Sequence, residues 1–280
     1  MKYKAFAKIN LLLEIINQRS DGYHNIKSYM VPVDLFDVIE IFDLPRDIIE
    51  ITCDDKNIPT DRTNLAYKAA DSLKRHCKIR NGVRIDIKKR IPTGAGLGGG
   101  SSNAGMVLRL LVKKWNLKIS NEKLLMIATE IGADVPFFLN PTLSEVSGIG
   151  DVVTPMDATF DCFVLIVNPG IEVSTRNVYK GTNIYLLASA ARISMKNALE
   201  KKNYPLVCKY MNNHLEKFAM TAYPEIAILK NELLKFGFDG VLMSGSGSSV
   251  YAVTRDERRL NIAYDSFKQK YDKVYKTRTL

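Results

Sequence analysis

The sequence predicts an α+β fold. The segment Val83–Lys88 alternates apolar and charged residues, as a half-exposed antiparallel strand does. Other segments, such as 64–76 and 121–131, carry apolar residues at helical spacing. No internal repeat or low-complexity segment interrupts this mixture, and 280 residues suit one large or two modest domains.

The first part of the chain is expected to be rich in strands. Lys4–Ile16 reads as a strand whose apolar run is long enough to be buried, and Asp21-Gly22 marks the turn after it. Further extended segments are expected at 27–33, 38–42 and 48–53. A helix follows over about 64–76, and the exposed strand at 83–88 then leads into a glycine-rich loop.

The second part of the chain is expected to mix helices with a central strand. Gly132 should end the helix 121–131, and Pro136 should force Val135 into an extended conformation. The apolar run Cys162–Val167 predicts a central strand. The remaining expected elements are helices at about 188–200, 204–220, 224–236 and 256–271, strands ending at 243 and covering 250–253 and 273–276, and a turn at 244–249.

The stretch Pro92–Val107, PTGAGLGGGSSNAGMV, has five glycines between Gly94 and Gly100 and then two serines. Glycines without Cβ let consecutive N–H groups converge on one point, and the residues after them, 103–112, read as the opening of a helix. A helix N-terminus preceded by exposed amides binds anions. The stretch therefore predicts a phosphate site, in which the Ser101 and Ser102 hydroxyls are available to a phosphate oxygen or to a Mg²⁺ bound to it.

Other glycine motifs fit this stretch less well. Residues 94–99 satisfy G-x-G-x-x-G, but a dinucleotide-binding fold needs a first strand buried on both faces, and Val83–Lys88 is half exposed. The chain contains no G-x-x-x-x-G-K-[ST] motif, and nothing in it reads as the catalytic loop of protein kinases. A flexible turn is the remaining alternative.

Bulk composition indicates a cytoplasmic protein. The four cysteines lack C-x-x-C pairing and histidine partners at zinc spacing, so they are expected to be reduced and no residue is assigned to a metal of its own. No apolar stretch reads as a signal peptide or approaches a membrane span. The net charge of +10 suits anionic ligands, but the basic residues are spread along the chain, so we expect no specific nucleic-acid partner and no membrane partner.

Several polar residues are candidates for catalysis or binding, and each has an ordinary structural alternative. Lys8 and Asn10 share a strand face by period two, where a lysine also serves edge protection. Asp134 is a candidate base, or a cap for the segment after it. His24, which follows Tyr23, reads by itself as an ordinary packing residue.

The sequence resembles the GHMP kinase family, through PxxxGLGGGSS followed by Asn103 and Ala104. The segments Ala7-Lys8-Ile9-Asn10, Asp21-Gly22-Tyr23-His24, 132-GADVP-136 and 244-SGSG-247 stand in the order of a member that acts on a cytidine diphosphate-linked methylerythritol in the non-mevalonate isoprenoid pathway. The resemblance implies an N-terminal domain over 1–155, like the second domain of ribosomal protein S5, and a ferredoxin-like C-terminal domain over 156–280.

The resemblance also implies a set of site residues. Lys8 and Asp134 would be the catalytic pair, with Asp134 as general base and ATP and Mg²⁺ as cofactors. The ATP phosphates would be bound by Pro92, Gly94, Gly96, Leu97, Gly98, Gly99, Gly100, Ser101 and Ser102. The cytidyl substrate would be bound by Asn10, Tyr23, His24, Thr175 and Tyr179, with the cytosine lying between the rings of Tyr23 and Tyr179.

Some alternatives stay open from sequence. Tyr179 can instead pack in the core while Tyr23 supports the turn at residues 21 and 22. Another GHMP kinase, acting on homoserine or mevalonate, would keep the loop and Asp134 but gives no reason for Tyr23-His24. A binding module with a dead site or a basic RNA-binding protein would keep only the fold. We expect a monomer or a weak homodimer.

Overall fold

The structure is a computed structural model that describes residues 1–183 and 191–280. It divides into two compact units. The first contains Met1–Ala7, Leu35–Ile91 and Gly98–Pro141, and the second contains Lys8–Asp34, Pro92–Leu97 and Thr142–Leu280. The expected domain boundary cuts the chain once, between residues 155 and 156, whereas each of these units contains several chain segments. The boundary therefore stays a prediction.

Two long strands, β1 (Tyr3–Gln18) and β2 (His24–Leu44), contribute residues to both units. The other elements of the first unit are β3 (Ile49–Cys53), α1 (Leu65–Cys77), β4 (Gly82–Lys88), α2 (Gly99–Lys114), α3 (Asn121–Ile131) and α4 (Val135–Leu139). Strand β4 pairs antiparallel with β2 and parallel with β3, so that Ile85 lies opposite both Ile41 and Ile51.

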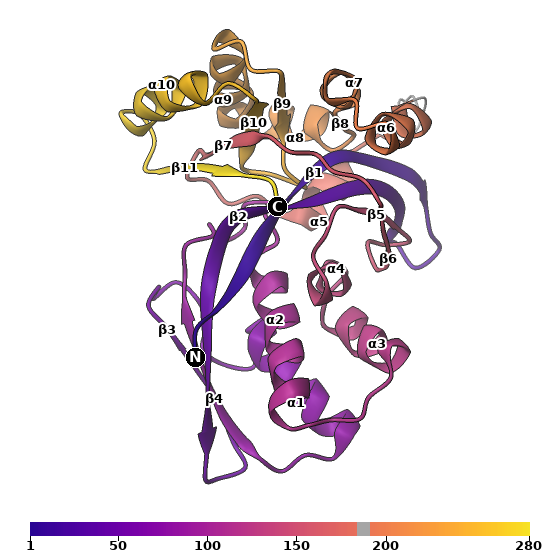
Figure 1. The fold of residues 1–280 in the computed structure, drawn as a ribbon, viewed down its shortest axis with the longest axis vertical. Coiled ribbons are helices and arrows are strands. Elements are labelled where there is room, and N and C mark those ends of the chain that lie inside the picture. The colour runs from indigo at the N-terminus through magenta and orange to yellow at the C-terminus, as the bar shows by residue number, and fades with distance from the viewer. Residues whose placement is uncertain (184–190) are drawn as a thin grey trace. The chain divides into compact units, whose positions relative to one another are not determined.

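Helices α1 and α2 lie on one face of the strands β2, β3 and β4 (Figure 1). The alternation in Val83–Lys88 puts Val83, Ile85 and Ile87 on this buried face, as the sequence predicts. Their partners in the core include Ala69 and Leu73 of α1, Val107, Leu108 and Leu111 of α2, and Ile127 of α3. Burying each valine, leucine or isoleucine side chain of this core contributes about 1.5–3 kcal/mol before entropy is counted.

The second unit has its own sheet, in which strands stand in the order β11-β7-β10-β9 and all pair antiparallel. This is the strand order of the expected ferredoxin-like domain, with β7 in the interior as its apolar run predicts. The elements of this unit are β5 (Ser144–Ser147), β6 (Val152–Pro155), β7 (Phe163–Asn168), α5 (Thr175–Gly181), α6 (Ala191–Glu200), α7 (Tyr204–Tyr210), β8 (Asn212–Asn213), α8 (Glu216–Ala222), α9 (Pro224–Lys235), β9 (Gly240–Met243), β10 (Val250–Thr254), α10 (Glu257–Lys268) and β11 (Lys273–Arg278).

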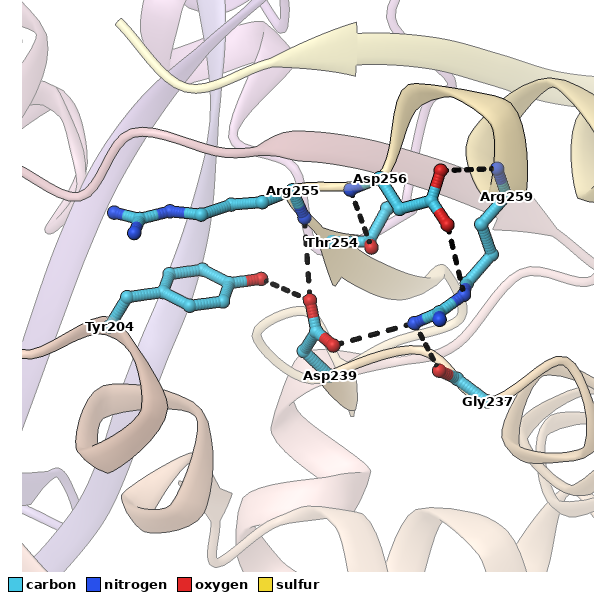
Figure 2. Close-up of polar contacts among 7 residues, drawn as sticks. All are labelled: Tyr204, Gly237, Asp239, Thr254, Arg255, Asp256 and Arg259. Carbon is cyan, nitrogen blue, oxygen red and sulfur yellow. Dashed lines mark hydrogen bonds and ion pairs between the residues drawn. The ribbon is translucent and has the colours of Figure 1, made fainter.

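A polar cluster around Asp239 connects three of these elements (Figure 2). The Asp239 carboxylate accepts hydrogen bonds from the Tyr204 hydroxyl of α7 at 2.8 Å, from the Arg255 amide at 3.3 Å and from the Arg259 guanidinium of α10 at 3.4 Å. Asp256 caps α10 by accepting from the Arg259 amide at 3.1 Å. Burial raises the pKa of the Tyr204 hydroxyl above its usual range, so this group acts as a donor.

Three local expectations were wrong. Helix α2 begins at Gly99, four residues before the expected start, because the Ser102 amide already donates to the carbonyl of Gly98, the N-cap residue, at 2.8 Å. Val135 is helical rather than extended, since Pro136 falls in the first turn of α4, where proline is tolerated. These changes place the glycine stretch and the residue after Asp134 on helix ends.

The third wrong expectation concerns the single helix at 204–220. Two helices, α7 and α8, occupy this range, and β8 separates them by pairing with Leu12 and Leu13 of β1. Tertiary strand pairing overrides the helical pattern here. The start of the helix expected at 188–200 lies outside the described residues, and its remainder is α6.

Among the described residues, no helix combines the length and the apolar character that crossing a membrane requires.

Candidate functional site

Lys8 is buried in β1, with only 3% of its surface exposed. Its ammonium donates hydrogen bonds to the Asn10 side-chain oxygen at 2.6 Å and to the Gly96 carbonyl at 2.9 Å. Its backbone amide donates to the Leu97 carbonyl at 3.0 Å. The structure therefore brings Lys8, Asn10 and the first half of the glycine stretch together, and Lys8 does not lie on an exposed strand edge.

Gly96 allows this contact because it has no Cβ and adopts a φ of +74°. A Cβ at this position would lie 1.9 Å from the Ser244 carbonyl oxygen. The Ser244 hydroxyl donates to the Gly96 carbonyl at 2.9 Å, so that this carbonyl accepts from both Lys8 and Ser244. The two glycine-rich segments of the second unit thus pack against each other at Gly96.

Asn213 holds the second of these segments, the turn at residues 244–249. Its side-chain amide donates to the carbonyls of Met243 at 2.9 Å and Gly245 at 2.8 Å, and its oxygen accepts from the Leu215 amide at 3.0 Å. All the polar atoms of this buried amide are therefore paired. The sequence does not predict a role for Asn213, because its local signal is no more than an Asn-Asn pair inside an otherwise helical pattern.

In the first unit, helix α2 begins with amides that have no hydrogen-bond partner within the helix. Gly98, at the N-cap, has a φ of +72° and supplies no side-chain cap, and the first turn contains no acidic residue. The first bond within the helix runs from the Ser102 amide to the Gly98 carbonyl at 2.8 Å. The three preceding amides, those of Gly99, Gly100 and Ser101, have no such partner, and they favour an anion.

The two serines of this turn differ. The Ser102 hydroxyl is buried and donates to the Phe6 carbonyl at 2.6 Å. Ser101 is half-buried, and its hydroxyl forms no hydrogen bond within the part of the chain that the structure describes. Ser101 is therefore the better candidate for a ligand contact. Of the other expected loop residues, Pro92 and Leu97 are buried, whereas Gly94 and Gly100 are exposed.

Asp37 anchors the backbone that enters the glycine stretch. Its fully buried carboxylate accepts from the amides of Arg90 at 2.7 Å and Ile91 at 2.9 Å, and it also pairs with the Lys89 ammonium. A buried carboxylate that lost these partners would be strongly destabilising, by about 3–5 kcal/mol. The bonds to Asp37 thus fix the three residues that precede Pro92.

Asp134 lies at the N-cap position of α4, and its side chain makes no capping hydrogen bond. Asp134 therefore does not cap α4, and the capping alternative that the sequence left open is wrong. Helix α4 packs closely on α2 at Gly105, where an added Cβ would lie only 2.7 Å from the Cβ of Phe138. Asp134 belongs to the first unit and Lys8 to the second, and their pairing stays a prediction.

Two of the expected substrate residues meet in the second unit. The rings of His24 and Tyr179 lie 5.4 Å apart between centroids, at an angle of 32°. Tyr179 also packs against the core of the unit, whereas Tyr23 is 60% exposed. Burial lowers the pKa of the His24 imidazole, which favours the neutral form with one donor and one acceptor. The Thr175 hydroxyl bonds the Ser246 hydroxyl at 2.8 Å.

The chain matches two protein families: GHMP kinases N terminal domain over residues 64–141 and GHMP kinases C terminal over residues 195–273. The chain belongs to the GHMP kinase family, and it is a kinase.

Its relatives specify the resemblance further. A protein from Clostridium botulinum named 4-diphosphocytidyl-2-C-methyl-D-erythritol kinase is 40% identical over 283 residues, which cover 100% of both chains. A protein of the same name from Bacillus velezensis is 38% identical, with 99% of this chain and 96% of the relative covered. A crystal structure of 4-(cytidine 5'-diphospho)-2C-methyl-D-erythritol kinase matches with a TM-score of 0.84 and 30% identity, covering 100% of this chain and 99% of the other.

The close contact at Gly96 leads to a stability prediction. Gly96→Ala should destabilise the protein more than Gly170→Ala, because Gly170 also has a positive φ, +84°, but nothing lies within 4 Å of its Cβ position. The excess should be about 1–3 kcal/mol, the usual cost of overpacking. Urea unfolding of both variants measures it. Equal losses in the free energy of unfolding of the two variants would show that the turn at Ser244 moves aside without destabilising the protein.

Proposed function

We propose that this kinase transfers the γ-phosphoryl group of ATP to the 2-hydroxyl of 4-diphosphocytidyl-2-C-methyl-D-erythritol, a step of non-mevalonate isoprenoid biosynthesis. The observation that carries the proposal is the full-length similarity to kinases named for this substrate. The four cysteines are free thiols, which agrees with a cytoplasmic location.

The glycine stretch is proposed to bind the phosphates of ATP. Support comes from the uncapped N-terminus of α2, where amides without a partner within the helix and the helix dipole attract negative charge. Mg²⁺ is proposed to accompany ATP and to neutralise charge on its phosphates. The described residues contain no cluster of three or more His, Cys, Asp or Glu side chains suited to a metal. This fits a metal held mainly by phosphates and water, with the Ser101 hydroxyl as its protein contact.

Lys8 and Asp134 are proposed to act on the reacting groups. Asp134 would accept the proton of the attacking hydroxyl, because a carboxylate is a general base at neutral pH. Lys8 would stabilise the negative charge that builds on the transferring phosphoryl group. The bonds that hold the Lys8 ammonium support a fixed position for this charge.

Specificity for the cytidyl group is proposed to come from Tyr23, His24 and Tyr179. Cytosine offers a flat face and an edge with both donors and acceptors. The neighbouring rings of His24 and Tyr179 supply a hydrogen-bonding edge beside an aromatic face. Homoserine and mevalonate, the substrates of the alternative kinases within the family, have no aromatic ring to stack on such a face. The exposed Tyr23 ring would cover the base from the other side.

One assay tests this function directly. ADP release should be measured with ATP and each of the cytidyl compound, homoserine, mevalonate and phosphomevalonate. Only the cytidyl compound should be phosphorylated. Phosphorylation of homoserine or mevalonate instead would replace the proposed substrate, and no turnover with any of them would refute the proposed activity.

Asp134→Asn keeps the shape of the side chain but removes the base. The kcat should fall by about 10²–10⁴, with the dissociation constant for ATP nearly unchanged. Lys8→Met should lose a comparable factor, and the double variant should lose much less than the product of the two if the residues act as one unit. A loss below about threefold in Asp134→Asn would mean that positioning, without a base, carries the reaction.

Tyr179→Ala and His24→Ala test the cytidyl site. Tyr179→Ala should raise KM for the cytidyl substrate by a factor that corresponds to about 1–3 kcal/mol of stacking, with KM for ATP unchanged. His24→Ala should also weaken the preference for cytosine over uracil, because a group paired with one base edge is left unpaired by the other. Variants that keep the parental KM for the cytidyl compound, or lose ATP affinity instead, would contradict this assignment.

A further inference from the structure

Ser28 is a fully buried serine in β2. Its hydroxyl donates to the Leu12 carbonyl at 2.5 Å and accepts from the Asn10 side-chain amide at 2.8 Å. The oxygen of the same Asn10 side chain accepts from the Lys8 ammonium at 2.6 Å. These residues all belong to the second unit, and they form one continuous series of hydrogen bonds from a strand carbonyl to Lys8.

The direction of each bond in this series is determined. A backbone carbonyl can only accept, so Ser28 must use its single proton on Leu12. The Ser28 oxygen then presents lone pairs to Asn10, which can satisfy them only with its NH₂ group. The Asn10 amide is thereby held in the orientation that turns its oxygen toward the Lys8 ammonium. The reverse orientation would place an NH₂ group against a cation.

We propose that Ser28 is a positioning residue for phosphoryl transfer, which fixes the Asn10 amide so that its oxygen holds the Lys8 ammonium. The inference rests on the proposed function, in which Lys8 acts on the transferring phosphoryl group. Ser28 touches neither substrate nor ATP in this proposal. Its effect should therefore appear in kcat, because Ser28 controls the position of the Lys8 charge, and the affinity for ATP should stay unchanged.

Ser144 provides a matched control. It is also a fully buried serine on a strand of the same sheet, where it pairs with Met30, two residues beyond Ser28. Its hydroxyl likewise donates to a backbone carbonyl, that of Thr142, at 2.9 Å. The series that ends at Lys8 does not include Ser144. Ser144→Ala therefore removes a comparable buried hydroxyl without releasing Asn10.

The experiment compares Ser28→Ala, Ser28→Thr and Ser144→Ala in the full chain, with ATP and the cytidyl substrate. Ser28→Ala should lower kcat by about tenfold or more with KM for ATP within about twofold, the range of effects seen when a contact within one hydrogen-bond network is lost. Ser28→Thr, which keeps the hydroxyl, should recover most of the rate. Ser144→Ala should keep the parental kcat.

A double-mutant cycle with Asn10→Asp separates positioning from general support of the sheet. A carboxylate presents an oxygen to Lys8 in either orientation, so it needs no hydroxyl to orient it. The loss of rate caused by Ser28→Ala should fall to about twofold or less when it is introduced into the Asn10→Asp variant. Single-turnover rates at high enzyme concentration keep slow variants measurable. The same loss in the parent and in the Asn10→Asp variant would refute the proposal.

The remaining outcomes are also decisive. A parental kcat in Ser28→Ala, or an equal loss in Ser144→Ala, would overturn the role of Ser28. If Ser28→Ala does not fold, Ser28→Cys replaces it, because a thiol keeps the approximate volume but is a weak hydrogen-bonding group. Ser28→Cys should then show the loss of kcat. An inactive parent enzyme would instead refute the proposed function, so the two failures can be told apart.

Discussion

The Gly96 carbonyl oxygen accepts hydrogen bonds from the Lys8 ammonium and from the Ser244 hydroxyl, each at 2.9 Å. A buried ammonium costs several kcal/mol unless polar groups replace its water, and hydrogen bonds to a charged donor contribute about 1.5–3 kcal/mol each. The carbonyl can take both donors because it has two lone pairs. The position of Lys8 in the second unit therefore depends on the backbone at Gly96.

This dependence extends into the turn at residues 244–249. Ser244 can reach Gly96 only while the turn keeps its form, and Asn213 fixes the carbonyls on either side of Ser244. Asn213 itself stands on β8, which pairs with β1 only a few residues beyond Lys8. The strand that carries the lysine thus also supports the segment that holds its acceptor in place. Within this unit, the contacts that position Lys8 run through Gly96, Ser244 and Asn213 and return to β1, so no single residue determines the site.

The sequence predicts most elements of the fold because their signals are local. The apolar run of β7, the alternation in β4 and Gly132 at the end of α3 each follow from a few neighbouring residues. The start of α2 could not be predicted in this way. Glycine is a poor helix former, so the sequence gives no local signal for the hydrogen bond from the Ser102 amide to the Gly98 carbonyl that begins the helix.

The residues of the candidate site also differ in whether a local sequence pattern predicts them. Period two in a strand places Lys8 and Asn10 on one face, and glycine density marks the phosphate loop, so both could be predicted. Ser28 and Asn213 could not, because what distinguishes them is the partner that each side chain meets across the sheet or the turn. A serine within a strand of 21 residues has no pattern of its own. Its role follows from direction: the proton that Ser28 gives to Leu12 determines which end of the Asn10 amide faces the lysine.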